Sequence, residues 1–414
     1  MKDGDSSGRR AAGTGAGAAE ARQPGRPWAG GEPTASRDLS AAIAEECGAG
    51  PDWPQVNRPF WRGRTVLVTG ASGFKGSWLA EALLRCDARV VGVVRPKSQP
   101  ASFYFRGDLA RRMDTACVDV SDARAVLELI NSVRPDVIFH LAAMSTVPVC
   151  RRDPTRAFEV NVLGALHVLD ACRRLAIVEK LLVCSTDHVF GQPDRDDAGQ
   201  GFAEDEPLGH GSPYDSSKVM MEIAVRSFVE SYAKALPEVV LSRCTNVFGP
   251  GDENQRRIVP EFVGSALWHG RISPRYPLTR RQYLGVLDVA EGYMKAVELP
   301  GARGLLPIRH FAPRGHAASG GEGATLSARD LAHEIAAVAA SRDRSVVVDA
   351  GGRMGDFAPG EARTLALDSG RTRRELRWEP RCDFRRTLSA TFRWYEELLA
   401  GGMSAATDAR GAPE

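Results

Sequence analysis

Short apolar runs alternate with longer helix-like stretches over residues 62–245 of the chain. The apolar runs, rich in Val, Leu and Ile, predict β-strands, and the stretches between them predict helices. This alternation indicates a parallel, doubly wound α/β sheet, with ligands bound at the carboxyl ends of its strands. Strands are expected at 64–69, 89–94, 115–118, 136–141, 180–185 and 239–243, and helices at 74–86, 122–133, 154–176 and 213–235.

The pattern weakens after residue 245 and is absent near both ends of the chain. Residues 1–60 are rich in Gly, Ala, Arg, Pro and Ser, so we expect a disordered N-terminal extension, in which residues 39–46 can form a short helix. Residues 246–280 and 300–398 are assigned to a second, smaller subdomain. Residues 399–414 are expected to be a flexible tail.

Glycines at positions 70, 73 and 76 follow the first expected strand and lead into the first expected helix. Such a turn lets backbone N–H groups and a helix N-terminus approach a pyrophosphate. The spacing, Gly-x-x-Gly-x-x-Gly, differs by one residue from the usual dinucleotide-binding Gly-x-Gly-x-x-Gly. An ordinary tight turn between a strand and a helix is the alternative interpretation.

Tyr214 and Lys218 form a Tyr-x-x-x-Lys motif in an expected helix, where positions i and i+4 share a face. An ammonium beside a phenol favours the phenolate, which would make Tyr214 a base near neutral pH. Thr186, which follows another expected strand, would place a hydroxyl on the same reacting oxygen. The alternative is a pair of residues on the surface of a helix, which the glycine turn in the same chain disfavours.

Charge, apolar run length and cysteine spacing argue against several classes of protein. The chain has 414 residues, 43% of them hydrophobic, and a formal net charge of +2, which favours neither nucleic acid nor a membrane surface as partner. No apolar run approaches the roughly 18–20 residues of a membrane span. The eight cysteines are scattered without Cys-x-x-Cys spacing, so we expect reduced thiols in a cytoplasmic enzyme and no metal site.

Together these motifs make the chain resemble the extended short-chain dehydrogenase/reductase family over about residues 62–398, and within it the sugar-nucleotide dehydratases and epimerases. Residues 74–79, Phe-Lys-Gly-Ser-Trp-Leu, are similar to those of CDP-glucose 4,6-dehydratases, as is the run 246–252 followed by Arg-Ile-Val-Pro at 257–260. Further matching segments are 119–120, 140–143, 161–164, 243–252 and 281–288.

The resemblance implies a Rossmann domain over residues 61–245, to which residues 281–299 return, and a substrate-binding role for the C-terminal subdomain. It also implies bound NAD. Arg95 lies where relatives often have an acidic residue for the adenosine ribose, so NADP is the alternative. Asp119 matches a residue that meets adenine. The expected cofactor-binding residues are Gly70, Ser72, Gly73, Phe74, Gly76, Arg95, Asp119, Val120, Leu141, Ala142, Ala143, Asn161, Tyr214 and Lys218.

Asp187 and His188 decide which reaction the resemblance implies. A 4,6-dehydratase oxidises C4, removes the C5 proton and loses the C6 hydroxyl, so it needs an acid and a base beyond Thr186, Tyr214 and Lys218. We assign the acid to Asp187 and the base to His188, although relatives have Asp-Glu or Asp-Lys there. A 4-epimerase or 4-ketoreductase, in which His188 would be structural, is the nearest alternative. A non-catalytic nucleotide-binding protein on the same fold is a third.

Four residues are expected to bind the nucleotide-sugar substrate. Asn246 and Arg281 match family residues that hold its phosphates, and Arg257 would add a further positive charge. Ser145, after the fourth strand, would reach sugar hydroxyls. For the arginines, simple solvation is the alternative. By family analogy we also expect a homodimer in which helices 154–176 and 213–235 pair between subunits.

Overall fold

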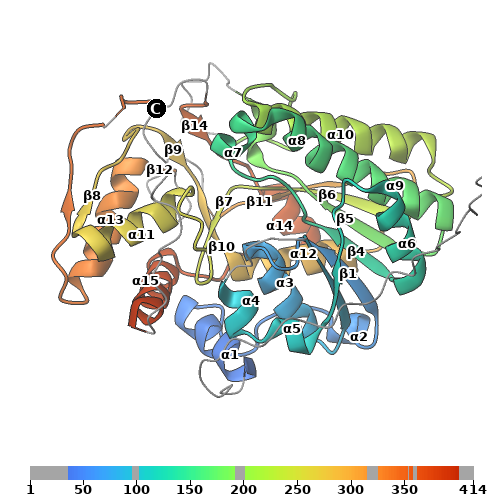
Figure 1. Ribbon diagram of the computed structural model, residues 1–414, viewed down its shortest axis with the longest axis horizontal. Coiled ribbons are helices and arrows are strands. Elements are labelled where there is room, and N and C mark those ends of the chain that lie inside the picture. Colours follow the sequence, from blue (N-terminus) through green and yellow to red (C-terminus); the bar gives the residue numbers. More distant parts are fainter. Residues whose placement is uncertain are drawn as a thin grey trace, which may run out of the picture. The chain divides into compact units, whose positions relative to one another are not determined.

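A seven-stranded parallel sheet forms the centre of the computed structural model, which describes residues 36–95, 102–191, 201–314, 325–352, 354–357 and 361–400. The strand order is β11-β6-β5-β4-β1-β2-β3, the arrangement of a doubly wound Rossmann sheet (Figure 1). All six predicted strands are confirmed: β1 (Thr65–Thr69), β2 (Arg89–Val94), β3 (Asp114–Cys117), β4 (Val137–His140), β5 (Lys180–Cys184) and β6 (Glu238–Cys244).

The seventh strand, β11 (Ile308–Phe311), lies in a segment that we had assigned to the substrate subdomain. It pairs in parallel with β6, from Ile308 against Leu241 to Phe311 against Cys244. Helix α14 (Gly370–Leu376) contacts β11 and also α12 (Val286–Glu298). Assigning all of residues 300–398 to the substrate subdomain was therefore wrong, because a four-residue strand outside the regular alternation has little signature in the sequence.

Helices cover both faces of the sheet, so its central strands are buried on both sides, whereas the edge strand β3 is largely exposed. Along β1, Val66 and Val68 belong to one hydrophobic core, while Leu67, between them, belongs to the other. The first core includes residues of α3 (Phe74–Leu84) and α12 (Val286–Glu298), and α12 also contacts β5 and β6. The second core includes residues of α6 (Ala123–Val133), α9 (Gly164–Leu175) and α10 (Pro213–Ser231).

The predicted helix 154–176 is interrupted by a π-helical turn. It consists of α8 (Pro154–Phe158), the π-helix Glu159–Leu163 and α9. Single π-turns inside α-helices are frequent near functional sites, and this one contains Asn161.

The remaining elements are shorter or lie beside the sheet (Figure 1). Helices α11 (Ile258–His269), α13 (Ala328–Ala340) and α15 (Phe384–Ala400) contact one another. Small sheets join β7 (Asn246–Phe248) to β10 (Tyr283–Gly285), β9 (Arg280–Arg281) to β12 (Leu326–Ser327) and β14 (Thr364–Leu365), and β8 (Arg271–Ile272) to β13 (Val347–Val348). The other helices are α1 (Ser36–Cys47), α2 (Arg58–Trp61), α4 (Ser102–Arg106), α5 (Leu109–Arg112), α7 (Val147–Arg152) and a 3-10 turn (Asp187–Phe190).

Residues 36–60 are ordered, which corrects the expectation of a largely disordered segment over residues 1–60. Helix α1, predicted at 39–46, packs against α15, and Ala44 and Trp53 are fully buried. The helix itself was predicted, but its packing against α15 depends on a partner far along the chain that the local composition does not indicate. Residues 1–35 and 401–414, which include most of the expected extension and tail, lie outside the described residues.

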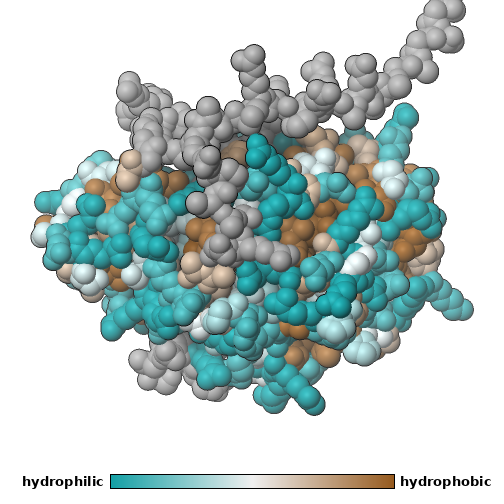
Figure 2. Space-filling model, turned by 90° about the horizontal axis from the view of Figure 1, so that it is seen from below, coloured by the Kyte–Doolittle hydropathy of each residue, from teal (hydrophilic) through white to brown (hydrophobic). Residues whose placement is uncertain are grey.

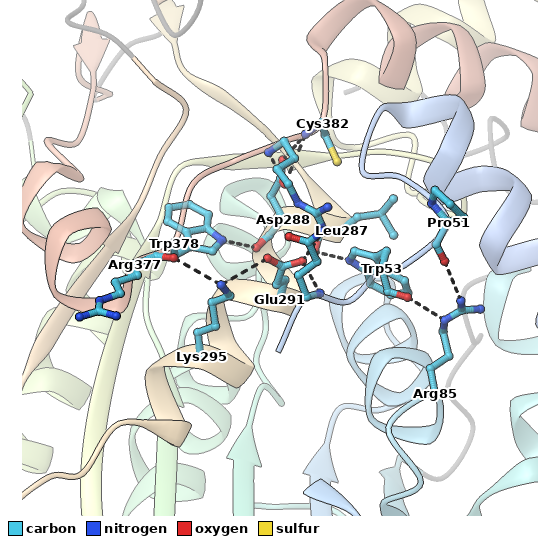
Figure 3. A network of polar contacts seen from close by, with 12 residues as sticks. Pro51, Trp53, Arg85, Leu287, Asp288, Glu291, Lys295, Arg377, Trp378 and Cys382 are labelled. Atoms are coloured by element: carbon cyan, nitrogen blue, oxygen red, sulfur yellow. Dashed lines mark hydrogen bonds and ion pairs between the residues drawn. The ribbon is translucent and has the colours of Figure 1, made fainter. Parts of the chain in front are cut away.

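A polar network ties this N-terminal segment to helix α12 and to the chain before α15 (Figure 3). Trp53 Nε1 donates a hydrogen bond to the Leu287 carbonyl at 3.1 Å, and Arg85 Nε donates to the Trp53 carbonyl at 2.9 Å. On α12, the carboxylate of Asp288 accepts hydrogen bonds from the backbone N–H groups of Arg381 and Cys382. The N-terminal segment is thus part of the folded unit.

Hydrophilic residues cover much of the described surface on the face shown in Figure 2, with hydrophobic residues visible between them. Among the residues that the structure describes, no helix is both long and apolar enough to span a bilayer.

Replacing Trp53 with Ala should lower the free energy of unfolding by about 3–5 kcal/mol, because it empties a fully buried site and removes an indole hydrogen bond. Urea denaturation measures the change. Leu305→Ala, at a side chain that is 63% exposed, is the control and should change stability by less than about 0.5 kcal/mol. A loss below about 1 kcal/mol for Trp53→Ala would show that the N-terminal segment is not integral to the fold.

Candidate active site

Two adjoining cavities open at the carboxyl ends of the central strands. The first has a volume of about 180 Å³ and begins at the glycine turn after β1. The second has a volume of about 320 Å³ and reaches toward β7, β9 and α11. The two share the lining residues Lys75, Ser145, Ser185, Tyr214 and Arg257, so two ligands in them would meet there.

The glycine turn makes the first cavity suitable for a dinucleotide. Gly70 adopts a φ of +73°, which disfavours other residues, and a Cβ there would lie 3.0 Å from the Ala142 nitrogen. A Cβ on Gly76 would lie only 2.1 Å from the Gly70 carbonyl oxygen. The turn therefore packs closely on itself and on residues 141–142, and residues 72–76 at the start of α3 line the cavity, where backbone N–H groups can meet a pyrophosphate. Expected residues that line this cavity are Gly70, Ser72, Gly73, Phe74, Gly76, Arg95, Val120, Leu141, Ala142, Ala143, Tyr214 and Lys218.

Asp119 and Asn161 were predicted to touch the cofactor, but neither lines this cavity. Asp119 accepts hydrogen bonds from Ser121 and pairs with Arg156, and its pKa is lowered because these contacts outweigh the opposing effect of burial. The Asn161 amide accepts the Met144 N–H at 2.8 Å and donates to Ser217 Oγ at 2.9 Å. Both side chains are thus engaged by other residues of the protein, and their contact with the cofactor stays a prediction.

Tyr214 and Thr186 form a hydrogen-bonded pair beside the second cavity, and Tyr214 lines both cavities. Burial raises the pKa of Tyr214 above its usual range, although the hydrogen bond with Thr186 opposes this. The Lys218 ammonium donates to the Cys184 carbonyl at 2.8 Å, and burial lowers its pKa to about 8. That Lys218 lowers the pKa of the phenol stays a prediction.

Asp187 lies beside this pair with one carboxylate oxygen uncommitted. Thr186 Oγ1 donates to Asp187 Oδ1 at 3.0 Å, while Oδ2 is buried and without a hydrogen-bond partner among the described residues. An orphaned buried oxygen that belongs to a cavity-lining residue can meet a group on a ligand.

His188 completes the cluster and is held by a residue that we had not singled out. Its Nδ1 lies 2.9 Å from Asp215 Oδ1, and its side chain lines the second cavity. Burial opposes the charged imidazolium, but the hydrogen bond to Asp215 and the charges of Asp187 and Asp215 outweigh it and raise the pKa of His188.

Sequence reasoning missed the roles of Asp215 and Lys75. Asp215 directly follows Tyr214, and the Ser-x-x-Asp spacing from Ser212 signals a helix cap rather than a contact with His188. Lys75 lines both cavities, and its ammonium lies 3.2 Å from Cys184 Sγ. A lysine inside the glycine turn was the available signal.

The four predicted substrate residues all line the second cavity: Ser145, Asn246, Arg257 and Arg281. The guanidinium of Arg257 donates to Asp252 at 3.1 Å and to Ser145 Oγ at 3.2 Å. Arg281, on β9, donates to the Ala362 carbonyl at 3.0 Å and its side chain is 8% exposed. Both arginines are thus oriented by the protein, which contradicts the alternative of simple solvation.

Comparison with known proteins agrees with this geometry. A model of the NAD dependent epimerase/dehydratase family matches residues 66–304. The chain belongs to this family. It is 26% identical to the CDP-glucose 4,6-dehydratase of Salmonella typhimurium over 356 residues, which cover 84% of this chain and 94% of that protein.

Two solved structures share the family fold. The dTDP-glucose 4,6-dehydratase DesIV of Streptomyces venezuelae, solved with NAD, is 25% identical with a TM-score of 0.67, over 80% of this chain and 97% of that one. The UDP-glucose 4-epimerase of Thermus thermophilus, also solved with NAD, is 26% identical with a TM-score of 0.66, over 80% of this chain and 99% of that one.

His188 should titrate with a midpoint above about 6.5 in an NMR pH titration, because Asp215 and Asp187 stabilise its charged form. Since the folded-state pKa is raised, the stabilisation from protonated His188 should be present below the unfolded-state pKa and lost as pH rises through the folded-state value. His140 and His310 serve as internal controls, because burial lowers their pKa values to about 3. A His188 midpoint below that of an exposed histidine would contradict this assignment.

Proposed function

We propose that this protein is an NAD-dependent sugar-nucleotide 4,6-dehydratase, with CDP-glucose as its first candidate substrate. One observation carries the proposal: Asp187 and His188 line the same cavity as Thr186 and Tyr214, and so add a second acid–base pair to the oxidation site. The likeness to a CDP-glucose 4,6-dehydratase over nearly its whole length supports this choice.

In this mechanism Tyr214 takes the proton of the C4 hydroxyl, and Thr186 positions that oxygen. Bound NAD⁺ would supply a hydride acceptor for C4 and, once reduced, a hydride donor for C6, and its positive charge would favour the phenolate form of Tyr214. His188 removes the C5 proton, which the ketone at C4 makes acidic. Asp187, in its protonated form, donates a proton through Oδ2 to the departing C6 hydroxyl, so water leaves and a double bond joins C5 and C6. When hydride is added at C6, protonated His188 returns a proton to C5.

The residues around the second cavity suit the diphosphate group of a nucleoside diphosphate sugar. Arg257 and Arg281 enter it from the N-terminus of α11 and from β9, and both are fixed by hydrogen bonds. Charge-assisted contacts from pre-oriented arginines bind phosphate at a small entropic cost. We therefore assign substrate binding to residues 246–280 and to those parts of 300–398 that lie outside β11 and α14.

NAD is the proposed cofactor. The glycine turn accommodates a pyrophosphate, and both related structures described above contain NAD. Arg95 is exposed at the end of β2 and lines the cofactor cavity, where it would meet the 2′-phosphate if NADP were bound instead.

A 4-epimerase or 4-ketoreductase is the second candidate, because these reactions need only Thr186, Tyr214 and Lys218. The similarity to a UDP-glucose 4-epimerase structure favours this alternative. In that case His188 would be a structural residue.

We further propose a homodimer and a cytoplasmic location. Met220 and Ile223 on α10, together with Leu163 on the neighbouring π-helix, are about half exposed, and they lie on the helices expected to pair between subunits. All eight cysteines are free thiols, as expected in a reducing compartment.

The purified protein should convert one of CDP-, GDP-, UDP- or dTDP-glucose to a product lighter by one water, with only catalytic NAD⁺ added. Mass spectrometry identifies both the product and the nucleotide. Tyr214→Phe should lower kcat by on the order of 10²–10⁴-fold, because it removes the proton acceptor at C4. Leu305→Ala, far more exposed and outside both cavities, should retain activity.

A product of unchanged mass would establish an epimerase, and a reaction that consumes NAD(P)H stoichiometrically would establish a reductase. Cofactor binding without turnover on any of the four nucleotides would contradict an enzymatic role on these substrates.

A further inference from the structure

The Asp215 carboxylate is held rigidly at the start of α10. Its Oδ2 accepts the Ser212 N–H at 2.7 Å, while the Asp215 N–H donates to Ser212 Oγ at 3.4 Å, which completes a capping box. A Cβ on Gly211 would lie 2.4 Å from the same Oδ2, so the preceding glycine leaves room for the carboxylate. Asp215 is 3% exposed, and its pKa is lowered because its hydrogen bonds and the charge of His188 outweigh burial.

The other oxygen of Asp215 faces His188. Oδ1 lies 2.9 Å from His188 Nδ1, and a carboxylate can only accept a hydrogen bond, so Nδ1 carries the proton. In neutral imidazole the lone pair then lies on Nε2. The backbone N–H of His188 also donates to Thr186 Oγ1 at 3.3 Å, which anchors the residue from the other side.

The other groups near His188 act on its ring through charge or packing. Asp187 adds a second negative charge from the same 3-10 turn, and Arg281 opposes it from β9. The ring of Tyr214 meets the imidazole edge to face, with centroids 5.5 Å apart. Asp215 is thus the group bonded to Nδ1, whereas the others act on the ring through charge or packing.

We propose that Asp215 is a positioning residue that makes His188 the base for the C5 proton by fixing the Nδ1–H tautomer and presenting Nε2 to the substrate cavity. The inference rests on the proposed dehydratase function. Asp215 stabilises the imidazolium that forms when His188 accepts a proton, as a carboxylate does for a histidine base elsewhere. A histidine can thereby supply the base that the proposed mechanism requires at C5.

The wild-type tautomer is measured first, by ¹⁵N NMR of histidine-labelled protein with His188→Gln for assignment. We expect Nδ1–H with Nε2 unprotonated at pH above the titration midpoint. An Nε2–H tautomer in the folded protein would overturn the proposal whether or not the enzyme dehydrates its substrate.

Asp215→Asn then tests the role in the reaction. The amide removes the charge and can donate to Nδ1, so the pKa of His188 should fall and the Nε2–H tautomer should appear. In D₂O, deuterium incorporation at C5 of the product should slow by on the order of 10²–10⁴-fold, with KM changed less than about threefold. The acid limb of the pH–rate profile should shift to lower pH, because a weaker base is neutral at lower pH.

Ser212→Ala is the matched control. It removes the side-chain half of the cap at the same helix end but leaves the Asp215 carboxylate, so it should lower stability while retaining the Nδ1–H tautomer and the pH profile. If Ser212→Ala reproduced the tautomer change, or if Asp215→Asn left both tautomer and C5 exchange unchanged, the proposal would be wrong. Failure of the wild-type protein to release water would instead refute the proposed function and leave the tautomer result standing.

Discussion

The packing of helix α10 against the end of strand β5 holds together the two segments that carry the proposed catalytic residues. Lys218 donates to the Cys184 carbonyl at 2.8 Å, and Ser185 Oγ donates to Glu222 at 2.6 Å. Glu222 is itself neutralised by the buried guanidinium of Arg243 at 2.7 Å. These contacts hold the 3-10 turn after β5 against the start of α10. The carboxyl, imidazole and phenol groups of the proposed mechanism come from those two segments.

Burial governs the electrostatics of this junction. It raises the pKa of Tyr214 and lowers that of Lys218 to about 8, so in the structure itself the phenol is protonated and the ammonium is poorly stabilised. A positively charged cofactor ring beside Tyr214 would lower the pKa of its phenol.

The sequence predicted those features that depend on local pattern. Six strands follow from β-branched apolar runs, the dinucleotide turn follows from Gly70, Gly73 and Gly76, and Tyr214 follows from its spacing to Lys218. The features that it did not predict arise from contacts between distant segments. Burial of Trp53, addition of β11 to the sheet edge and the bond from Asp215 to His188 each need a partner that the local pattern does not name.

We propose that one site oxidises C4, removes water and reduces C6 of the same sugar. This is tested by incubating the protein with C4-deuterated CDP-glucose, or with the C4-deuterated form of the nucleotide sugar found active in the substrate survey, and analysing the product by NMR. We expect deuterium to move to C6, because the atom removed from C4 is returned within one turnover. Deuterium retained at C4, or lost from the sugar altogether, would contradict the dehydratase mechanism.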